Sequence, residues 1–237
     1  KLAALSVSVG TSVSVPNSLG PAELLLKYGT EQQKNYYLPR LAKGDEIPCF
    51  ALTSPDAGSD AASMIDYGVI VKQNKEGIEH LAIKLNWNKR YITLAPIATV
   101  LGLAFKLYDP DHLVGDKEDL GITCALIPTK TPGIDIGRYH APLNAVFANG
   151  PTQGKDVIIG FDQIIGGSAE IGNGWRMLME CLAVGRCISI PSMVAGGSKK
   201  LSYISGVYGR IRKQFNTPIV SFEGVQEPII KIVGYTY

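Results

Sequence analysis

The spacing of apolar residues changes twice along this 237-residue chain, and that change limits the possible folds more than any other feature. Residues 20–47 show helical spacing, and residues 49–165 show short β-rich runs separated by Gly, Pro, Asn and Asp. Helical spacing returns after residue 172. This order argues against alternating β and α units, and it predicts an α+β fold with one antiparallel β domain. The run 97–107 is apolar throughout, which predicts a strand buried on both faces, with a short helix as the alternative.

Local signals predict the ends of the first helices. Pro21 begins a helical pattern, since proline is tolerated in the first turn of a helix. Thr30, with Gln33 three residues later, is a capping box. Its helix is expected to run to about Leu38, before Pro39.

The C-terminal region is predicted to be mostly helical. Apolar residues recur at helical spacing from Trp175 to Ile211, and Pro191 predicts a bend within that stretch. Residues 216–218 end the pattern, and another helix is expected from about Phe222.

Composition excludes some function classes. The chain is 46% hydrophobic and 19% charged, as in ordinary globular proteins, and its formal net charge of +2 argues against a nucleic-acid partner. The four cysteines show neither CxxC spacing nor histidine partners at metal-ligand spacing, so no metal site is predicted. We interpret them as free buried thiols of a reducing cytosol.

Both ends of the sequence are typical of a segment taken from a longer protein. The first residue is Lys1, and residues 1–15 are too short and too polar to span a membrane. Residues 230–237 stop inside an apolar periodic run. The chain is therefore expected to be a fragment.

The stretch CFALTSPDAGSD, residues 49–60, places small residues and hydroxyls directly after an apolar strand. Glycine lets a ligand approach the backbone closely, and successive N–H groups can bind an anion. Taken alone, residues 57–60 are explained more simply by a turn that ends the strand.

A second stretch, residues 88–93, combines an aromatic ring with a hydroxyl. Period-2 alternation places Tyr91 and Thr93 on one face of a strand, an arrangement suited to a flat heteroaromatic ligand. An ordinary half-buried strand is the alternative. The glycines after residue 165 lack the GxGxxG pattern of a dinucleotide-binding fold, and no histidine lies beside a candidate nucleophile.

Together, these stretches are more specific than any one of them. FALTSPDAGSDA, NKRYIT, TPGIDIGR, NGWRMLMECLAVGR and RKQF occur in an order and spacing that resemble the acyl-CoA dehydrogenase family, closest to its bacterial FadE-type long-chain branch. The resemblance implies three parts: the end of an N-terminal helical domain (1–47), a middle β domain (48–165) that binds flavin and acyl-CoA, and the start of a C-terminal helical-bundle domain (166–237).

The resemblance also implies FAD as cofactor. Thr53 is expected to bond the pyrimidine side of the flavin ring, Thr93 to bond near N5 and O4, and Arg212 to reach the FAD of a neighbouring subunit. The expected cofactor-binding residues are Phe50, Leu52, Thr53, Gly58, Ser59, Tyr91, Ile92, Thr93, Arg212 and Phe215, and the expected substrate-binding residues are Ser59, Gly185 and Arg186. For Arg186, a surface arginine that only packs its stem is the alternative.

The implied reaction converts acyl-CoA to trans-2-enoyl-CoA in fatty-acid β-oxidation. A carboxylate removes the α-proton while the β-hydrogen leaves as a hydride to the flavin. No glutamate of this chain matches the family's catalytic base, which is expected beyond Tyr237. The fragment alone is therefore expected to be inactive.

Three positions depart from the family pattern. Ser54 replaces the glutamate of the T-E-P motif, which is expected to be tolerated because that side chain is not the base. Ala183 lacks an aspartate that faces CoA in some relatives, and Glu223 replaces a glutamine near the FAD diphosphate, where a carboxylate would repel phosphate unless it turned away or took a proton.

Two alternatives stay open at this stage: an acyl-CoA oxidase, which passes electrons to oxygen, and a non-catalytic relative that binds flavin or acyl-CoA. The resemblance further implies an electron-acceptor flavoprotein as partner and a homo-oligomer. It implies a cytoplasmic location and leaves open an association with the inner face of the membrane.

Overall fold

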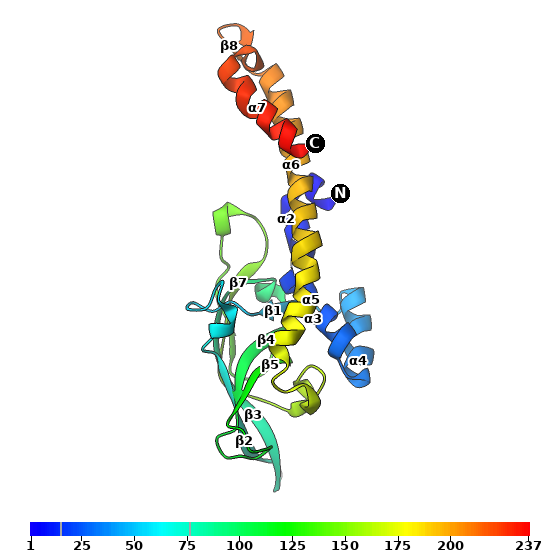
Figure 1. Ribbon diagram of the computed structural model, residues 1–237, viewed down its shortest axis with the longest axis vertical. Coiled ribbons are helices and arrows are strands. Elements are labelled where there is room, and N and C mark those ends of the chain that lie inside the picture. The colour runs from blue at the N-terminus through cyan, green and yellow to red at the C-terminus, as the bar shows by residue number, and fades with distance from the viewer. Residues whose placement is uncertain (15, 76) are drawn as a thin grey trace.

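The computed structural model describes residues 1–14, 16–75 and 77–237, and helices lie along one side of a β-sheet and extend beyond it (Figure 1). Helices come first in the chain, the strands of the sheet follow, and helices come last, as the apolar spacing predicts. The helices are α1 (Leu2–Leu5), α2 (Val7–Ser14), α3 (Pro16–Tyr28), α4 (Glu31–Lys43), α5 (Gly174–Val184), α6 (Ile190–Ile211) and α7 (Glu223–Thr236). The strands of the sheet are β1 (Pro48–Ala51), β2 (Tyr67–Lys75), β3 (Ile78–Thr93), β4 (Val100–Tyr108), β5 (Asp119–Pro128), β6 (Ile134–Ile136) and β7 (Asn149–Ile159).

The sheet is mixed. Its strand order is β1-β4-β2-β3-β7-β6, and β5 also pairs with β4. The pairs β2–β3, β3–β7, β4–β5 and β6–β7 are antiparallel, as expected, but β1 and β2 both run parallel to β4. The antiparallel prediction is wrong for those two pairs. A long connection, here through β2 and β3, permits parallel pairing, whereas a tight hairpin does not.

Strand β3 is long and irregular. The register of its pairing with β7 shifts between Leu85 and Trp87 and again between Lys89 and Ile92. These irregularities bend the strand without ending it, because a bulge accommodates an extra residue. Ile92 and Thr93 therefore belong to the same strand as Leu85 and Trp87.

Two prolines lie inside helices, where the sequence predicts helix ends. Helix α3 begins at Pro16 and includes Pro21, and α4 includes Pro39 and continues to Lys43. A proline removes one backbone hydrogen bond, and packing of α3 and α4 on the sheet offsets that loss. The predicted capping box of α4 is confirmed, since Gln33 N donates to Thr30 Oγ1.

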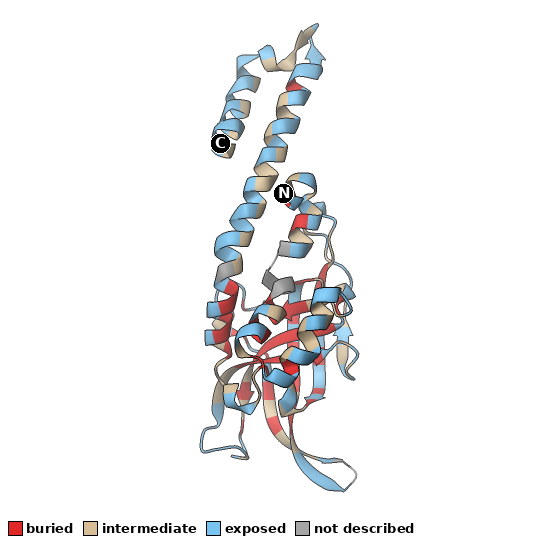
Figure 2. Cartoon of the chain, turned by 90° about the vertical axis from the view of Figure 1, so that its right-hand side faces the viewer, coloured by how far each residue is buried: buried red, intermediate tan, exposed pale blue. Residues whose placement is uncertain are grey.

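The C-terminal helices form a hairpin that extends away from the sheet (Figures 1 and 2). Near Pro191, where the sequence predicts a bend, the structure has a π-helical segment, Gly185–Ser189, and Pro191 lies in the first turn of α6. Strands β8 (Lys213–Gln214) and β9 (Thr217–Pro218) form the tip, and α7 then returns along α6. By length and composition alone, Gly174–Ile211 could also cross a membrane, a criterion that core helices of soluble proteins meet as well.

Two apolar clusters occupy the two faces of the sheet. Along β1, Cys49 and Ala51 belong to one cluster, while Phe50 and Leu52 belong to the other, which α3 and α5 cover. Strand β4 divides in the same way, so the run predicted to be buried on both faces is a strand from Val100 onward, and Ile97 and Thr99, which precede that strand, are exposed. Both faces of β1 and of most of β4 are thus buried.

All four cysteines are free thiols, as predicted. Cys49, Cys124 and Cys181 are buried, but Cys187 is exposed, so the prediction of burial is wrong for that residue. It lies in the π-helical segment Gly185–Ser189, which has no buried residue.

Candidate functional site

The loop that follows β1 carries the first group of candidate site residues. Phe50 and Leu52 are buried in the core, Thr53 is half-buried, and Gly58 and Ser59 are exposed. A pair of backbone hydrogen bonds between Ser54 and Ala57 closes the turn, with N···O distances of 3.1 and 3.4 Å. The structure thus presents the small residues at the surface, while the contacts expected of Phe50 and Leu52 with a flavin stay predictions.

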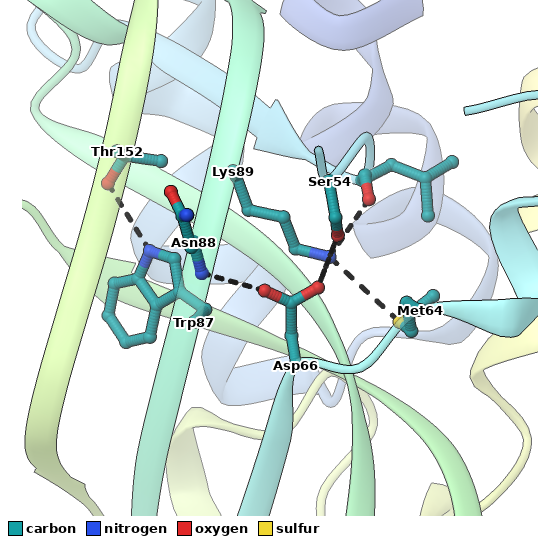
Figure 3. Close-up of polar contacts among 8 residues, drawn as sticks. Ser54, Met64, Asp66, Trp87, Asn88, Lys89 and Thr152 are labelled. Atoms are coloured by element: carbon teal, nitrogen blue, oxygen red, sulfur yellow. Dashed lines mark hydrogen bonds and ion pairs between the residues drawn. The ribbon is translucent and has the colours of Figure 1, made fainter. Parts of the chain in front are cut away.

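A buried ion pair lies directly beneath this loop (Figure 3). The Nζ atom of Lys89, on β3, lies 2.5 Å from Oδ2 of Asp66 and also donates to the carbonyl of Leu52 at 2.9 Å and to Ser54 Oγ at 3.1 Å. Ser54 Oγ in turn donates to Asp66. Burial lowers the pKa of Lys89, and the attraction of the Asp66 carboxylate opposes that effect.

This network fixes the loop on β3. Oδ1 of Asp66 accepts a bond from the backbone N–H of Asn88 at 2.7 Å, and the Thr53 carbonyl accepts one from Arg90 N at 3.0 Å. Because buried charges are stable only with partners, each contact restricts the others. Thr53 is therefore held beside the strand that carries Thr93.

The end of β3 has unusual backbone geometry. Tyr91 has a φ of 58° and Leu94 a φ of 68°, both in the left-handed region that residues other than glycine seldom adopt. Between them, Ile92 and Thr93 are buried, whereas the Tyr91 ring is 54% exposed. The bulge thus turns the Tyr91 ring toward solvent. Simple alternation along the strand would place Tyr91 and Thr93 on one face. The bulge changes that arrangement, because an extra residue shifts the alternation of side chains.

Thr93 is paired with Asn149, the first residue of β7. Asn149 Nδ2 donates to Thr93 Oγ1 at 3.4 Å, and Asn149 Oδ1 lies 3.1 Å from Nδ1 of His140. The His140 ring packs against the Tyr91 ring at a centroid distance of 4.7 Å. A polar chain therefore connects the loop before β7 to Thr93.

The other candidate residues lie on the C-terminal helices. Gly185 and the exposed Arg186 are in the π-helical segment at the base of the hairpin. Arg212 ends α6, and Phe215, which is 90% exposed, packs edge-on against Phe222 at the tip. Arg212 and Phe215 flank β8, and β8 lies far from β1 (Figure 1). Their contact with another subunit's cofactor stays a prediction.

The three departures from the family pattern differ in their surroundings. Ser54 is buried in the network with Asp66 and Lys89, Ala183 is exposed on α5, and Glu223 is exposed in the first turn of α7. A carboxylate at the N-terminus of a helix is favourable for the helix, which gives Glu223 a structural role.

Sequence reasoning missed Asp66, Lys89, His140 and Asn149. For Lys89 a signal was present, since period-2 alternation places it on the same side of β3 as the buried Leu85 and Trp87. The contacts of the other three depend on strand pairing across the sheet, which local pattern does not show.

The chain matches two family models. The model described as "Acyl-CoA dehydrogenase, middle domain" matches residues 49–157, and the one described as "Acyl-CoA dehydrogenase, N-terminal domain" matches residues 1–45. The chain belongs to the acyl-CoA dehydrogenase family. The FadE-type branch is a finer assignment that these matches do not address.

The chain is also similar to curated proteins and to solved structures. An acyl-CoA dehydrogenase of Bacillus subtilis (strain 168) is 30% identical over 234 residues, which is 95% of this chain and 55% of that protein. A protein named HemX from Proteus mirabilis is 57% identical over 103 residues, 44% of this chain and 61% of that protein. The structure of a Bacillus anthracis acyl-CoA dehydrogenase complexed with FAD has a TM-score of 0.75 at 26% identity, covering 91% of this chain and 34% of that one.

The chain spans about half the length of the curated relatives it matches. The activity, substrates and partners of the whole protein are accordingly taken up as proposals below.

Proposed function

We propose that this protein is an FAD-dependent acyl-CoA dehydrogenase of fatty-acid β-oxidation that converts acyl-CoA, of long chain length, to trans-2-enoyl-CoA. The observation that carries the proposal is the position of Thr53 beside β3. The Thr53 carbonyl accepts a hydrogen bond from the backbone N–H of Arg90, which lies three residues before Thr93 on that strand. Two hydroxyls from distant parts of the sequence thereby lie on neighbouring segments. The family membership and the FAD complex of the Bacillus anthracis relative support flavin as the ligand.

The described residues fit a flavin. A Cβ atom built on Gly58 meets nothing within 4 Å, so the fold itself does not require a glycine there and the space is open to a ligand. The Tyr91 ring is exposed beside this region and can pack against a flat ring system. Within the described part of the chain, no acceptor is assigned to the Thr93 hydroxyl proton.

When bound, the flavin supplies the chemistry of hydride acceptance. The role of this chain is to bind and orient it. A hydroxyl donor at Thr93 would stabilise negative charge that develops during reduction, because a fixed donor needs no reorganisation. Lys89 and Asp66 hold the Thr53 loop, and the closed core beneath it excludes water from one side. The catalytic carboxylate is proposed to come from sequence outside this chain.

The FadE-type branch, the electron-acceptor flavoprotein, the homo-oligomer and a cytoplasmic location, with the inner face of the membrane as a second possibility, are parts of the same proposal. The two longer stretches at residues 15–60 and 87–110, which resemble that branch in particular, support it. The exposed positions of Arg212 and Phe215, on either side of β8 at the tip of the hairpin, support a role in a neighbouring subunit.

The test is turnover by the purified full-length protein. With palmitoyl-CoA and an electron-acceptor dye, we expect trans-2-enoyl-CoA by mass spectrometry, and little hydrogen peroxide when the dye is replaced by oxygen. Peroxide formed in proportion to product would identify an oxidase instead. A protein that binds flavin but yields no product would identify a non-catalytic relative, and the described fragment alone should be inactive in the same assay.

A further inference from the structure

The polar chain from His140 to Thr93 has a direction. An asparagine amide has one acceptor oxygen and one donor nitrogen. The oxygen of Asn149 faces His140 Nδ1 at 3.1 Å, so Nδ1 carries the proton of that bond. The nitrogen of Asn149 faces Thr93 Oγ1 at 3.4 Å, so the Thr93 oxygen accepts. The hydroxyl proton of Thr93 is therefore left to point at a different acceptor.

The chain is buried at the Thr93 end and supported at the other. Asn149 and Thr93 are each 5% exposed, and they are register partners on β7 and β3. The backbone N–H of His140 donates to the Asn149 carbonyl at 2.7 Å, which holds the two residues together independently of their side chains. In a buried site, polar groups with partners keep one arrangement, because an unpaired group is costly.

The ring of His140 is also fixed. It packs against the Tyr91 ring at 4.7 Å with an interplanar angle of 50°. The left-handed backbone of Tyr91, with a φ of 58°, brings this ring to the outside of β3, where the guanidinium of Arg90 also lies 5.5 Å from its centroid. The strained bulge thus serves two groups: it exposes Tyr91 and it provides a surface for His140.

We propose that His140 and Asn149 are positioning residues that make the Thr93 hydroxyl a hydrogen-bond donor to the bound ligand. The proposal rests on the proposed function for the identity of that ligand, a flavin whose N5 and O4 can accept. Neither His140 nor Asn149 has to touch the ligand. Their effect is that Thr93 Oγ1 already accepts a hydrogen bond from Asn149, so that the Thr93 hydroxyl is available to the ligand only as a donor.

The direction of the chain is testable without flavin. In the apo form of the full-length protein labelled with 15N-histidine, long-range nitrogen–proton correlation spectra report which ring nitrogen carries the proton. We expect neutral His140 to be the Nδ1–H tautomer, with its signals assigned from their loss in His140→Asn. The Nε2–H tautomer would overturn the proposal, because Asn149 would then donate to His140 and accept from Thr93.

The effect on the ligand is tested with two matched variants of His140. His140→Phe keeps a ring against Tyr91 but removes the donor, and His140→Asn places an amide nitrogen near the position of Nδ1 but removes the ring. We expect His140→Phe to lower the midpoint potential of the bound flavin and to slow its reduction by substrate about tenfold. His140→Asn should keep both close to the wild-type values. The reverse order would show that ring packing alone matters and would overturn the proposal.

Asn149→Asp replaces the amide nitrogen that donates to Thr93 by a carboxylate oxygen that accepts, without changing the shape of the side chain. Its carboxylate accepts from Thr93, so the hydroxyl donor turns away from the ligand and the flavin potential should fall. Because a negative charge near the flavin lowers the potential by itself, the comparison is made in a Thr93→Val background. We expect Asn149→Asp to lower the potential less in that background than in the wild type. Equal shifts in both backgrounds would show a charge effect only and contradict the proposal.

The proposed function and the positioning roles of His140 and Asn149 can be contradicted separately. A full-length wild-type protein that binds no FAD would contradict the proposed function, whereas the histidine tautomer would still report the direction of the chain. A wild-type protein that binds FAD and turns over acyl-CoA, with both His140 variants unchanged in potential, would contradict only the positioning roles.

Discussion

The ammonium nitrogen of Lys89 lies 2.5 Å from Oδ2 of Asp66, and both side chains are buried beneath the loop that carries Thr53. The pair connects β3 to the residues between β1 and β2, since Lys89 also bonds the Leu52 carbonyl and Ser54. Two charges in the interior are therefore used to fix a loop whose exposed residues are candidate ligand contacts.

Replacing Lys89 by methionine should destabilise the protein strongly. The change leaves the Asp66 carboxylate buried without its cation, which lowers the free energy of unfolding by about 3–5 kcal/mol. Lys72→Met is the control, because the Lys72 side chain is 54% exposed and its ion pair with Glu79 lies at the surface. That control should lose less than about 1 kcal/mol. Urea denaturation of the full-length protein checks this, and equal losses in the two variants would contradict it.

Restoring the glutamate that is typical of the family at position 54 should be harmful in this chain. Ser54 contacts both Asp66 and Lys89, so Ser54→Glu adds a second carboxylate beside a single ammonium group. We expect a loss of about 2 kcal/mol or more in the free energy of unfolding. The double variant Ser54→Glu, Asp66→Ser moves the carboxylate instead of adding one and should regain at least half of that loss. A double variant less stable than Ser54→Glu alone would show that the two carboxylate positions are not equivalent.

A side chain at Gly58 should affect binding more than stability. Since a Cβ at Gly58 or at Gly115 meets nothing within 4 Å, leucine at either position should change the free energy of unfolding by no more than about 0.5 kcal/mol. Gly58→Leu should weaken the binding of FAD or acyl-CoA about tenfold or more, whereas Gly115→Leu should not. Binding is measured by flavin fluorescence and by calorimetry with an acyl-CoA. Unchanged affinities in Gly58→Leu would remove that residue from the candidate site.

The cysteines should differ in reactivity. Burial raises the pKa of the Cys49 and Cys124 thiols to about 12, so at pH 8 only about one such thiol in ten thousand is a thiolate. Cys187 is exposed. Iodoacetamide followed by peptide mass spectrometry should therefore modify Cys187 first, and Cys49 and Cys124 only after denaturation. Early labelling of Cys124 would show that the core opens in the native state.

Local chemistry explains which parts of the fold were predictable. The cap at Thr30 and Gln33 depends on residues three positions apart, and the alternation along the strands depends on neighbours, so both are visible in the sequence. The helix ends predicted at Pro21 and Pro39 are wrong, because packing of their helices on the sheet outweighs the lost hydrogen bonds. The parallel pairing of β1 with β4 joins strands far apart in the chain, and local pattern carries no information about it.

The candidate site shows the same division. Thr53 and Thr93 follow from motifs, but the residues that hold them do not. The partner of Lys89 lies 23 positions earlier, and Asn149 lies 56 positions after Thr93. Only the strand pairing of the folded sheet brings these groups together, which is why a motif can suggest a ligand contact without showing what fixes it.

The most direct measurement of the central claim is the visible spectrum of the purified full-length protein under anaerobic conditions. We expect flavin absorbance that bleaches when palmitoyl-CoA is added, because electrons from the acyl chain reduce the bound FAD. A protein without flavin absorbance after incubation with FAD, or one whose flavin spectrum stays unbleached with acyl-CoA substrates of every chain length, would contradict it.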